Sequence, residues 1–174
     1  MRFPRFAGPF LALLLAAYSC QAAPKLGITS PYFAEGATIP SQFTCEGANK
    51  SPDIEISGVP AGAKSLVLIV DDPDAPSRIF THWLVWNISP DTRKIASGAA
   101  PSGAVEGTND FGSVGYSGPC PPSGTHRYFF RLSALDTTIQ IATGASRREL
   151  EEAMRGHVIG SALLMGRYAK TGGQ

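Results

Sequence analysis

Four apolar runs along the chain have the length and composition of β-strands. They are rich in β-branched and aromatic residues and are bounded by Pro, Gly and other turn-forming residues. They comprise residues 64–72, 81–89, 125–134 and 158–169. The first two are apolar at nearly every position, which predicts strands covered on both faces. Because only eight residues (73–80) separate them, we expect a hairpin-like connection.

One amphipathic helix is predicted, from Arg147 to about Arg155. Ser146 can cap its first turn, and Glu149 three residues later completes a capping box. Gly156 is a natural stop. The apolar stripe of this helix consists of Leu150, Ala153 and Met154. One short helix among strands cannot build a repeating βαβ sheet, so the pattern predicts a mainly β protein, a β-sandwich with a peripheral helix.

Further features support a turn-rich β domain. Residues 26–30 and 54–57 are short strand candidates, and Gly160 and Gly166 indicate bulges or close packing in the last strand. The chain contains 19 Gly and 14 Pro among 174 residues, well above the average of roughly 12% for the two together. Residues 98–123 form a long Gly-rich segment, which we expect to be irregular and, like many such loops, functional.

Composition and charge narrow the class of protein. Apolar residues make up 43% of the chain, which is ordinary for a globular core and argues against disorder. Lys and Arg total 15 against 14 Asp and Glu, giving a net charge of +1. Nucleic-acid binders normally carry a basic excess or a basic stripe, so we expect no nucleic-acid partner.

The first 22 residues have the features of an export signal. Arg2 and Arg5 precede an apolar stretch at residues 10–17, and small residues follow up to Ala22. The stretch is too short for a membrane span of about 20 residues, so the mature form should have no transmembrane segment. We therefore expect one domain, residues 23–174, of an exported protein that is periplasmic or secreted. A lipoprotein anchored through Cys20 is the alternative.

The cysteine content then suggests a cross-link. Cleavage after Ala22 leaves two cysteines, Cys45 and Cys120. Paired thiols tend to oxidise in exported proteins, which predicts a Cys45–Cys120 disulfide. The alternative is two separate buried thiols, because spacing in sequence cannot show that the two Cα atoms approach closely enough.

Two segments carry the candidate chemistry. The first, residues 71–78 (DDPDAPSR), places carboxylates at the end of a buried strand, and His82 opens the next one. If the strands pair, His82 can lie beside Asp72 or Asp74, and a carboxylate fixes an imidazole's tautomer. In the second, residues 115–128, glycines and prolines can form an anion-binding nest. There His126 and Tyr128 point to one face of a strand.

These segments also resemble a known family. The DPDAP run, the THWLVWN strand, the GYSGPCPPSGTHRY loop and the GSALLMGRYA strand are similar to the phosphatidylethanolamine-binding protein family, most closely its bacterial Raf-kinase-inhibitor-like branch. The SQFTCEGANKSPDIEISGVP stretch fits the same branch, so the resemblance covers nearly all of residues 23–174. It implies an antiparallel β-sandwich of two sheets with one short C-terminal helix.

The resemblance also implies a small surface pocket for anions such as phosphate and phosphorylated headgroups. Carried over to this chain, the pocket residues are Asp72, Asp74, His82, Gly118, Cys120, Pro121, Pro122, His126 and Tyr128. The chain departs from the animal proteins at Thr81, where they have a histidine, and at Cys120, where they have a glycine. Two carboxylates in an anion site have two explanations. They could face the ammonium group of a zwitterionic ligand, or they could orient His82 and His126.

The function implied is non-catalytic binding of a small phosphate-bearing ligand, with no metal and no cofactor. Through that pocket the protein could regulate or inhibit a kinase or a protease. One alternative is a pure protein-interaction module with a vestigial pocket. Another is a metal-dependent hydrolase that uses His82, His126 and the aspartates, since these side chains suit zinc or iron. A third is thiol chemistry, with Cys120 as nucleophile and His126 as base.

Overall fold

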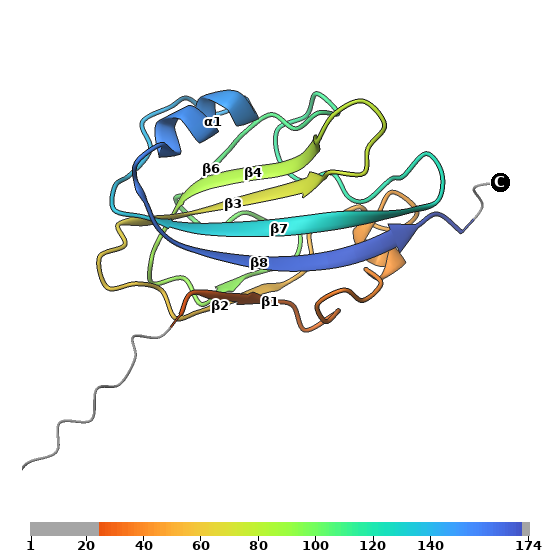
Figure 1. Ribbon diagram of the computed structural model, residues 1–174, viewed down its shortest axis with the longest axis horizontal. Coiled ribbons are helices and arrows are strands. Elements are labelled where there is room, and N and C mark those ends of the chain that lie inside the picture. Colours follow the sequence, from red (N-terminus) through yellow and green to blue (C-terminus); the bar gives the residue numbers. More distant parts are fainter. Residues whose placement is uncertain (1–24, 172–174) are drawn as a thin grey trace, which may run out of the picture.

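The computed structural model describes residues 25–171 and has the mainly β architecture that the sequence predicts (Figure 1). The predicted export signal and Cys20 lie outside the described residues. The strands are β1 (Gly27–Thr29), β2 (Ile54–Ser57), β3 (Ser65–Asp72), β4 (Phe80–Ile88), β5 (Lys94–Ile95), β6 (Val105–Glu106), β7 (Thr125–Leu135) and β8 (Val158–Ala169). The helices are a 3₁₀ turn, η1 (Ser41–Phe43), and α1 (Arg147–Met154).

The strands form two antiparallel sheets. The larger has five strands in the order β6-β4-β3-β7-β8, and the smaller has three in the order β1-β2-β5. Figure 1 shows α1 on one side of the large sheet and β1 and β2 on the other. The fold therefore has three layers, with the large sheet in the middle, and the predicted β-sandwich with a peripheral helix is confirmed.

Two hydrophobic cores follow from this layering. The inner core, between the sheets, contains the even-numbered apolar residues of β3, whereas Val67 and Ile69 pack on the other side with Leu150 and Met154 of α1. Every residue of β3 is buried, as expected for a strand covered on both faces. Within residues 25–171, no helix is long and apolar enough to cross a membrane.

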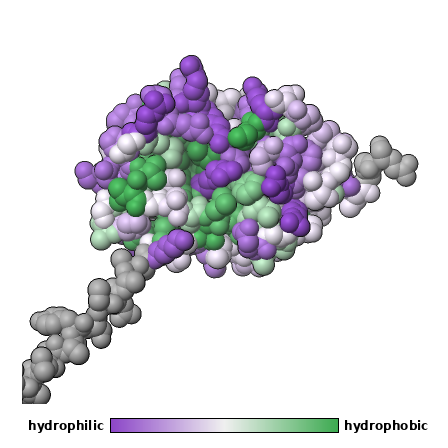
Figure 2. All heavy atoms as spheres, in the orientation of Figure 1, coloured by the Kyte–Doolittle hydropathy of each residue, from purple (hydrophilic) through white to green (hydrophobic). Residues whose placement is uncertain are grey.

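Surface apolar residues gather partly on the edge strand β8. On this strand the side chains of Val158, Ile159 and Leu163 are exposed. Figure 2 shows hydrophobic and hydrophilic residues interspersed on the face of the molecule that Figure 1 presents. The polar side chains therefore divide the apolar surface into several small areas on this face.

Local signals in the sequence explain the helix and the last strand. The side chain of Ser146 accepts from the backbone N–H of Glu149, and the Glu149 carboxylate accepts from the Ser146 N–H, so the predicted capping box is present. Gly156 ends this turn with a φ of 81°. A Cβ on Gly166 would collide with the side chains of Ile39 and Phe33, which confirms a close-packing role.

The predicted disulfide is present between Cys45 and Cys120, whose Cα atoms are 5.4 Å apart. It joins the segment after η1 to the loop before β7. The strands β5 and β6, two residues each, were not predicted, and residues 98–123 are otherwise irregular as expected. Two residues are too few to show an alternating apolar pattern, so sequence reasoning cannot find such strands. They form where a neighbouring strand provides hydrogen-bond partners.

Candidate functional site

A β-bulge at the start of β4 decides where His82 points. Val70 pairs with Trp83 and Asp71 pairs with Thr81, so His82 is the extra residue in its strand. The His82 ring consequently lies on the inner side of the sheet, with its centroid 5.2 Å from that of Tyr128. A regular strand would have turned His82 to the same side as Leu84, in the outer core. Bulges are frequent beside functional sites because they redirect side chains in this way.

A cavity of about 220 Å³ lies at this end of the sheet, where β3 ends and β4 begins. Four residues of the expected site line it, namely Asp72, His82, Cys120 and Pro122. Its other walls come from Ala75, Pro76, Phe80 and Phe111. The cavity therefore combines two polar residues, Asp72 and His82, with apolar and aromatic walls.

Asp72 pairs with His126 rather than with His82. His126 Nδ1 lies 2.6 Å from Asp72 Oδ2, and both side chains are buried. The other oxygen of Asp72 accepts from the backbone N–H of Asp74 at 2.8 Å. A carboxylate accepts from the ring N–H, so Asp72 fixes the orientation of His126 and leaves Nε2 as the free ring nitrogen.

His82 is fixed by a backbone carbonyl. Its Nδ1 lies 2.6 Å from the oxygen of Ser117. A carbonyl oxygen can only accept, so Nδ1 carries the hydrogen and Nε2 is free in the neutral ring. Burial lowers the pKa of His82 below its usual value of 6.5, against opposing effects of the Ser117 bond and the Asp72 charge. His82 is therefore held neutral more strongly than a free histidine at the same pH.

Asp74 is engaged elsewhere and does not line the cavity. Its carboxylate accepts from the guanidinium of Arg127 at 2.9 and 2.6 Å and from the Arg127 backbone N–H at 2.9 Å. The guanidinium hydrogen bonds lower the pKa of Asp74 to about 2. This carboxylate anchors the loop between β3 and β4 to β7.

Gly118 and Pro121 shape the loop without lining the cavity. The Gly118 N–H donates to the side-chain oxygen of Asn49 at 2.8 Å, so this group is not free for an anion. A Cβ on Gly118 would collide with the carbonyl oxygen of Phe43, which explains why a glycine is required here. Cys120 is bonded to Cys45, so the thiol-nucleophile alternative is excluded while the disulfide is intact.

Tyr128 does not line the cavity and is fully buried, with its ring against that of the lining residue His82. Its hydroxyl makes no hydrogen bond of good geometry among the described residues, although the Asp72 carboxylate and the Cys120 backbone are neighbouring polar groups. Burial first, and then the negative charge of Asp72, raise the pKa of this hydroxyl, so it stays protonated and can donate. A buried hydroxyl without a partner is costly, and its presence needs a physical explanation.

Sequence reasoning missed the aromatic wall. Phe80 and Phe111 contact each other with ring centroids 4.8 Å apart, and Phe111 is also 5.4 Å from the His82 ring. Phe111 lies in the long irregular segment and is 49% exposed. The only signal for it was that an unusually long loop is often functional.

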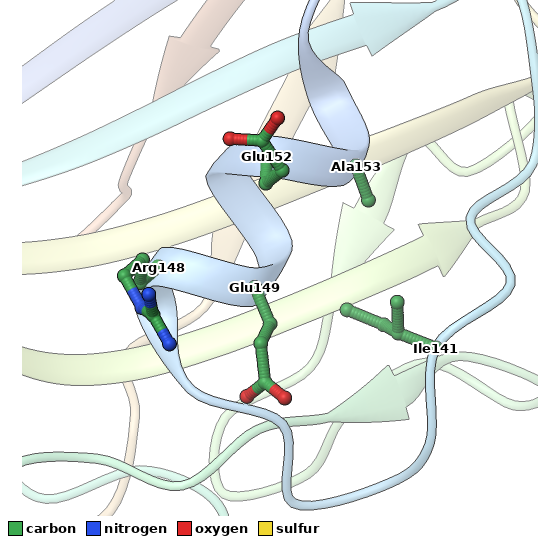
Figure 3. Close-up of a pocket in the computed structure, with 5 residues that line it drawn as sticks. All are labelled: Ile141, Arg148, Glu149, Glu152 and Ala153. Atoms are coloured by element: carbon green, nitrogen blue, oxygen red, sulfur yellow. The ribbon is translucent and has the colours of Figure 1, made fainter.

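A second cavity, of about 490 Å³, lies beside α1 but gathers no comparable chemistry. Figure 3 shows its residues, which include Arg148, Glu149 and Glu152 on the helix and Ile141 on the preceding loop. Glu149 completes the capping box and Glu152 pairs with Arg155, so both carboxylates already have structural partners. Among residues 25–171, no group of three or more His, Cys, Asp or Glu side chains is arranged to hold a metal ion.

Comparisons with known proteins agree with this fold. The family model for phosphatidylethanolamine-binding proteins matches residues 29–169. A UPF0098 protein of Methanothermobacter thermautotrophicus is 52% identical over 143 residues, covering 79% of this chain and 95% of its own. The crystal structure of a putative phosphatidylethanolamine-binding protein homolog from Chlamydia trachomatis is 43% identical and superposes with a TM-score of 0.81, over 84% of this chain and 99% of that one.

A second solved structure, YbcL of E. coli, is described as a new member of the mammalian family. It is 33% identical, with a TM-score of 0.80 over 84% of this chain and 99% of its own. Sequence, fold and family model therefore lead to one assignment. The chain belongs to the phosphatidylethanolamine-binding protein family.

Proposed function

We propose that the pocket lined by Asp72, His82, Cys120 and Pro122 binds a small anionic, phosphate-bearing ligand without chemical turnover. The observation that carries the proposal is the buried Tyr128 hydroxyl, which makes no hydrogen bond of good geometry among the described residues and belongs to a ring packed against that of His82. A ligand oxygen would give this hydroxyl the acceptor it needs. The free Nε2 atom of His82, which lines the pocket, would add a donor when a bound anion favours the protonated ring.

The contacts of the two aspartates argue against contact with an ammonium group, and they favour an orienting role only for Asp72, toward His126. Asp74 is held by Arg127, and each oxygen of Asp72 already accepts one hydrogen bond. We therefore expect phosphorylethanolamine and inorganic phosphate to bind with similar affinity. A preference for phosphorylethanolamine of about tenfold or more, the scale of one charge-assisted hydrogen bond, would restore the zwitterion explanation.

The decisive experiment removes the hydroxyl oxygen of Tyr128. In Tyr128→Phe we expect calorimetric affinity for inorganic phosphate and sulfate to fall about tenfold, because the ligand loses a buried donor. Stability to urea should stay the same or rise, because the lost hydroxyl had no partner. A stability loss without a change in affinity would make Tyr128 a structural residue and remove the main support for the pocket.

Tyr116→Phe is the matched control. Its hydroxyl donates to the carbonyl oxygen of Phe43 at 2.8 Å, and Tyr116 lines a different cavity, together with Trp83 and Glu106. We expect this variant to lose roughly 1 kcal/mol of unfolding free energy and to keep its anion affinity. Tyr128→Phe is therefore expected to change binding but not stability, and Tyr116→Phe to change stability but not binding.

Regulation of a protein partner, such as a kinase or protease, is the second candidate function. Ile79 and Phe111 are each 49% exposed and lie in the two loops beside the pocket, where a partner could contact them. If the pocket is vestigial, Ile79→Ser with Phe111→Ser should abolish inhibition of a target enzyme, whereas Tyr128→Phe should not affect it.

We also propose that the protein is exported. The disulfide between Cys45 and Cys120 supports this, because such bonds persist mainly in oxidising compartments. The mass of the protein purified from its host would test the proposal. Cleavage near Ala22 supports a soluble exported form, and a lipid-modified Cys20 supports the anchored one.

A further inference from the structure

A buried asparagine in the long loop, Asn109, uses the full hydrogen-bonding capacity of its side chain. Its oxygen accepts from the backbone N–H groups of Phe111 at 3.0 Å and Ser113 at 3.2 Å. Its nitrogen donates to the carbonyl of Gly115 at 2.9 Å and to the hydroxyl of Ser117 at 3.0 Å. An amide side chain has two donors and two lone pairs, so none is left for a ligand.

These bonds lead directly to two walls of the pocket. Ser117 donates its N–H to the carbonyl of His82 at 3.0 Å and accepts from His82 Nδ1 at 2.6 Å. Phe111, whose N–H is held by Asn109, packs against the rings of Phe80 and His82. One buried side chain therefore connects the residue that fixes the His82 tautomer with the residue that forms the aromatic wall.

We propose that Asn109 is a positioning residue of this pocket. It does not touch the ligand. It holds Ser117 so that His82 carries its hydrogen on Nδ1, and it holds Phe111 over the cavity. The inference rests on the proposed anion-binding function, but its effect on His82 exists without any ligand.

The loop has a second anchor that keeps it attached when Asn109 is changed. The Asp110 carboxylate accepts from the Thr81 N–H at 2.6 Å and from Arg78 at 2.8 Å, and the Asp110 N–H donates to the Thr81 carbonyl at 2.9 Å. Removal of the Asn109 side chain should therefore disturb residues 111–117 of the loop, whereas Asp110 should stay bonded to Thr81 on β4. This makes Asn109→Ala a variant that can fold.

Asn87 provides a matched control. Its side chain donates to the carbonyl of Ile139 and accepts from the Ile139 N–H, both at 2.8 Å, so it also secures a loop. Ile139 belongs to the outer core beneath α1, away from the pocket. The φ of Asn87 is 55°, which disfavours alanine, so Asn87→Ala should lose at least as much stability as Asn109→Ala.

The experiment combines sulfate titration with nitrogen NMR of the histidine rings. In Asn109→Ala we expect sulfate affinity to fall by about tenfold and the Nδ1–H preference of His82 to be lost. Asn87→Ala should keep both properties despite its lower stability. Asn109→Ala with unchanged sulfate affinity and an unchanged His82 tautomer would overturn the inference.

Two further outcomes remain decisive. If Asn109→Ala does not fold, Ser117→Ala removes only the hydroxyl that accepts from Asn109. It should shift affinity and tautomer in the same direction, and no shift would contradict the inference. If the unchanged protein binds neither sulfate nor phosphate, the proposed function fails. The tautomer of His82 in the ligand-free variants then tests the positioning role by itself.

Discussion

At the scale of single residues, the burial of His82 makes the stability of the fold depend on pH. The folded pKa is lowered from 6.5, so the unfolded chain binds the proton more readily than the folded one. This contribution to stability is fully present above pH 6.5 and is lost as the pH falls towards the folded pKa.

We therefore expect the free energy of unfolding to decrease as the pH is lowered below 6.5, and His82→Gln to reduce that decrease. Urea unfolding of both proteins across this range measures the difference. Asn87→Ala provides the control, because the side chain that it removes carries no titratable group, so this variant should be less stable with an unchanged pH dependence. Equal slopes for His82→Gln and the unchanged protein would contradict the assignment.

The burial of His126 changes the expected stability cost of replacing this residue. A histidine at the end of a strand is expected to bury little surface, so sequence reasoning predicts a small stability cost for His126→Ala. The structure makes that premise wrong, because His126 is only 7% exposed and is bonded to the buried carboxylate of Asp72.

Removing the ring in His126→Ala leaves Asp72 without this donor. We expect a loss of about 1–3 kcal/mol in unfolding free energy, the cost of an unsatisfied buried polar group. Adding Asp72→Asn should recover part of the loss, because the uncompensated charge is then absent. Chemical unfolding of the single and double variants tests this, and strictly additive losses would argue against a coupled pair.

At the scale of elements, α1 depends on its first turn. Ser146 caps the helix, and the helix covers the outer core through Leu150 and Met154. Ser146→Ala should lower the free energy of unfolding by about 1 kcal/mol. Ser57→Ala, on the exposed face of β2 in the small sheet, is a suitable control for thermal or urea unfolding, because the small sheet and α1 lie on opposite sides of the large sheet (Figure 1). An unchanged midpoint for Ser146→Ala would mean that tertiary packing alone holds the helix.

At the scale of the whole molecule, the disulfide ties the pocket loop to the segment after η1. Cys45 and Cys120 are 75 residues apart in sequence, and closing a loop of this length stabilises by roughly 4 kcal/mol in the chain-entropy description. Cys45→Ser with Cys120→Ser should lose a comparable amount in urea unfolding under non-reducing conditions. Reductant should lower the stability of the unchanged protein to the same level and leave the double variant unaffected.

The sequence by itself determined the elements whose signals are local. The capping box of Ser146 and Glu149 marks α1 within a residue or so, and the fully apolar run of β3 indicates burial on both faces. Motifs such as DPDAP and GPCPP also sufficed to name the family. These features depend on neighbouring residues in the chain, so they can be recognised without the fold.

Only the tertiary structure decided how the site is connected. The bulge at His82, the pairing of Asp72 with His126 and the capture of Asp74 by Arg127 depend on register between strands. A shift of one residue in register moves a side chain to the other face of a sheet, and sequence patterns do not fix bulges. Contacts between residues distant in sequence therefore determined which of the expected site residues line one cavity.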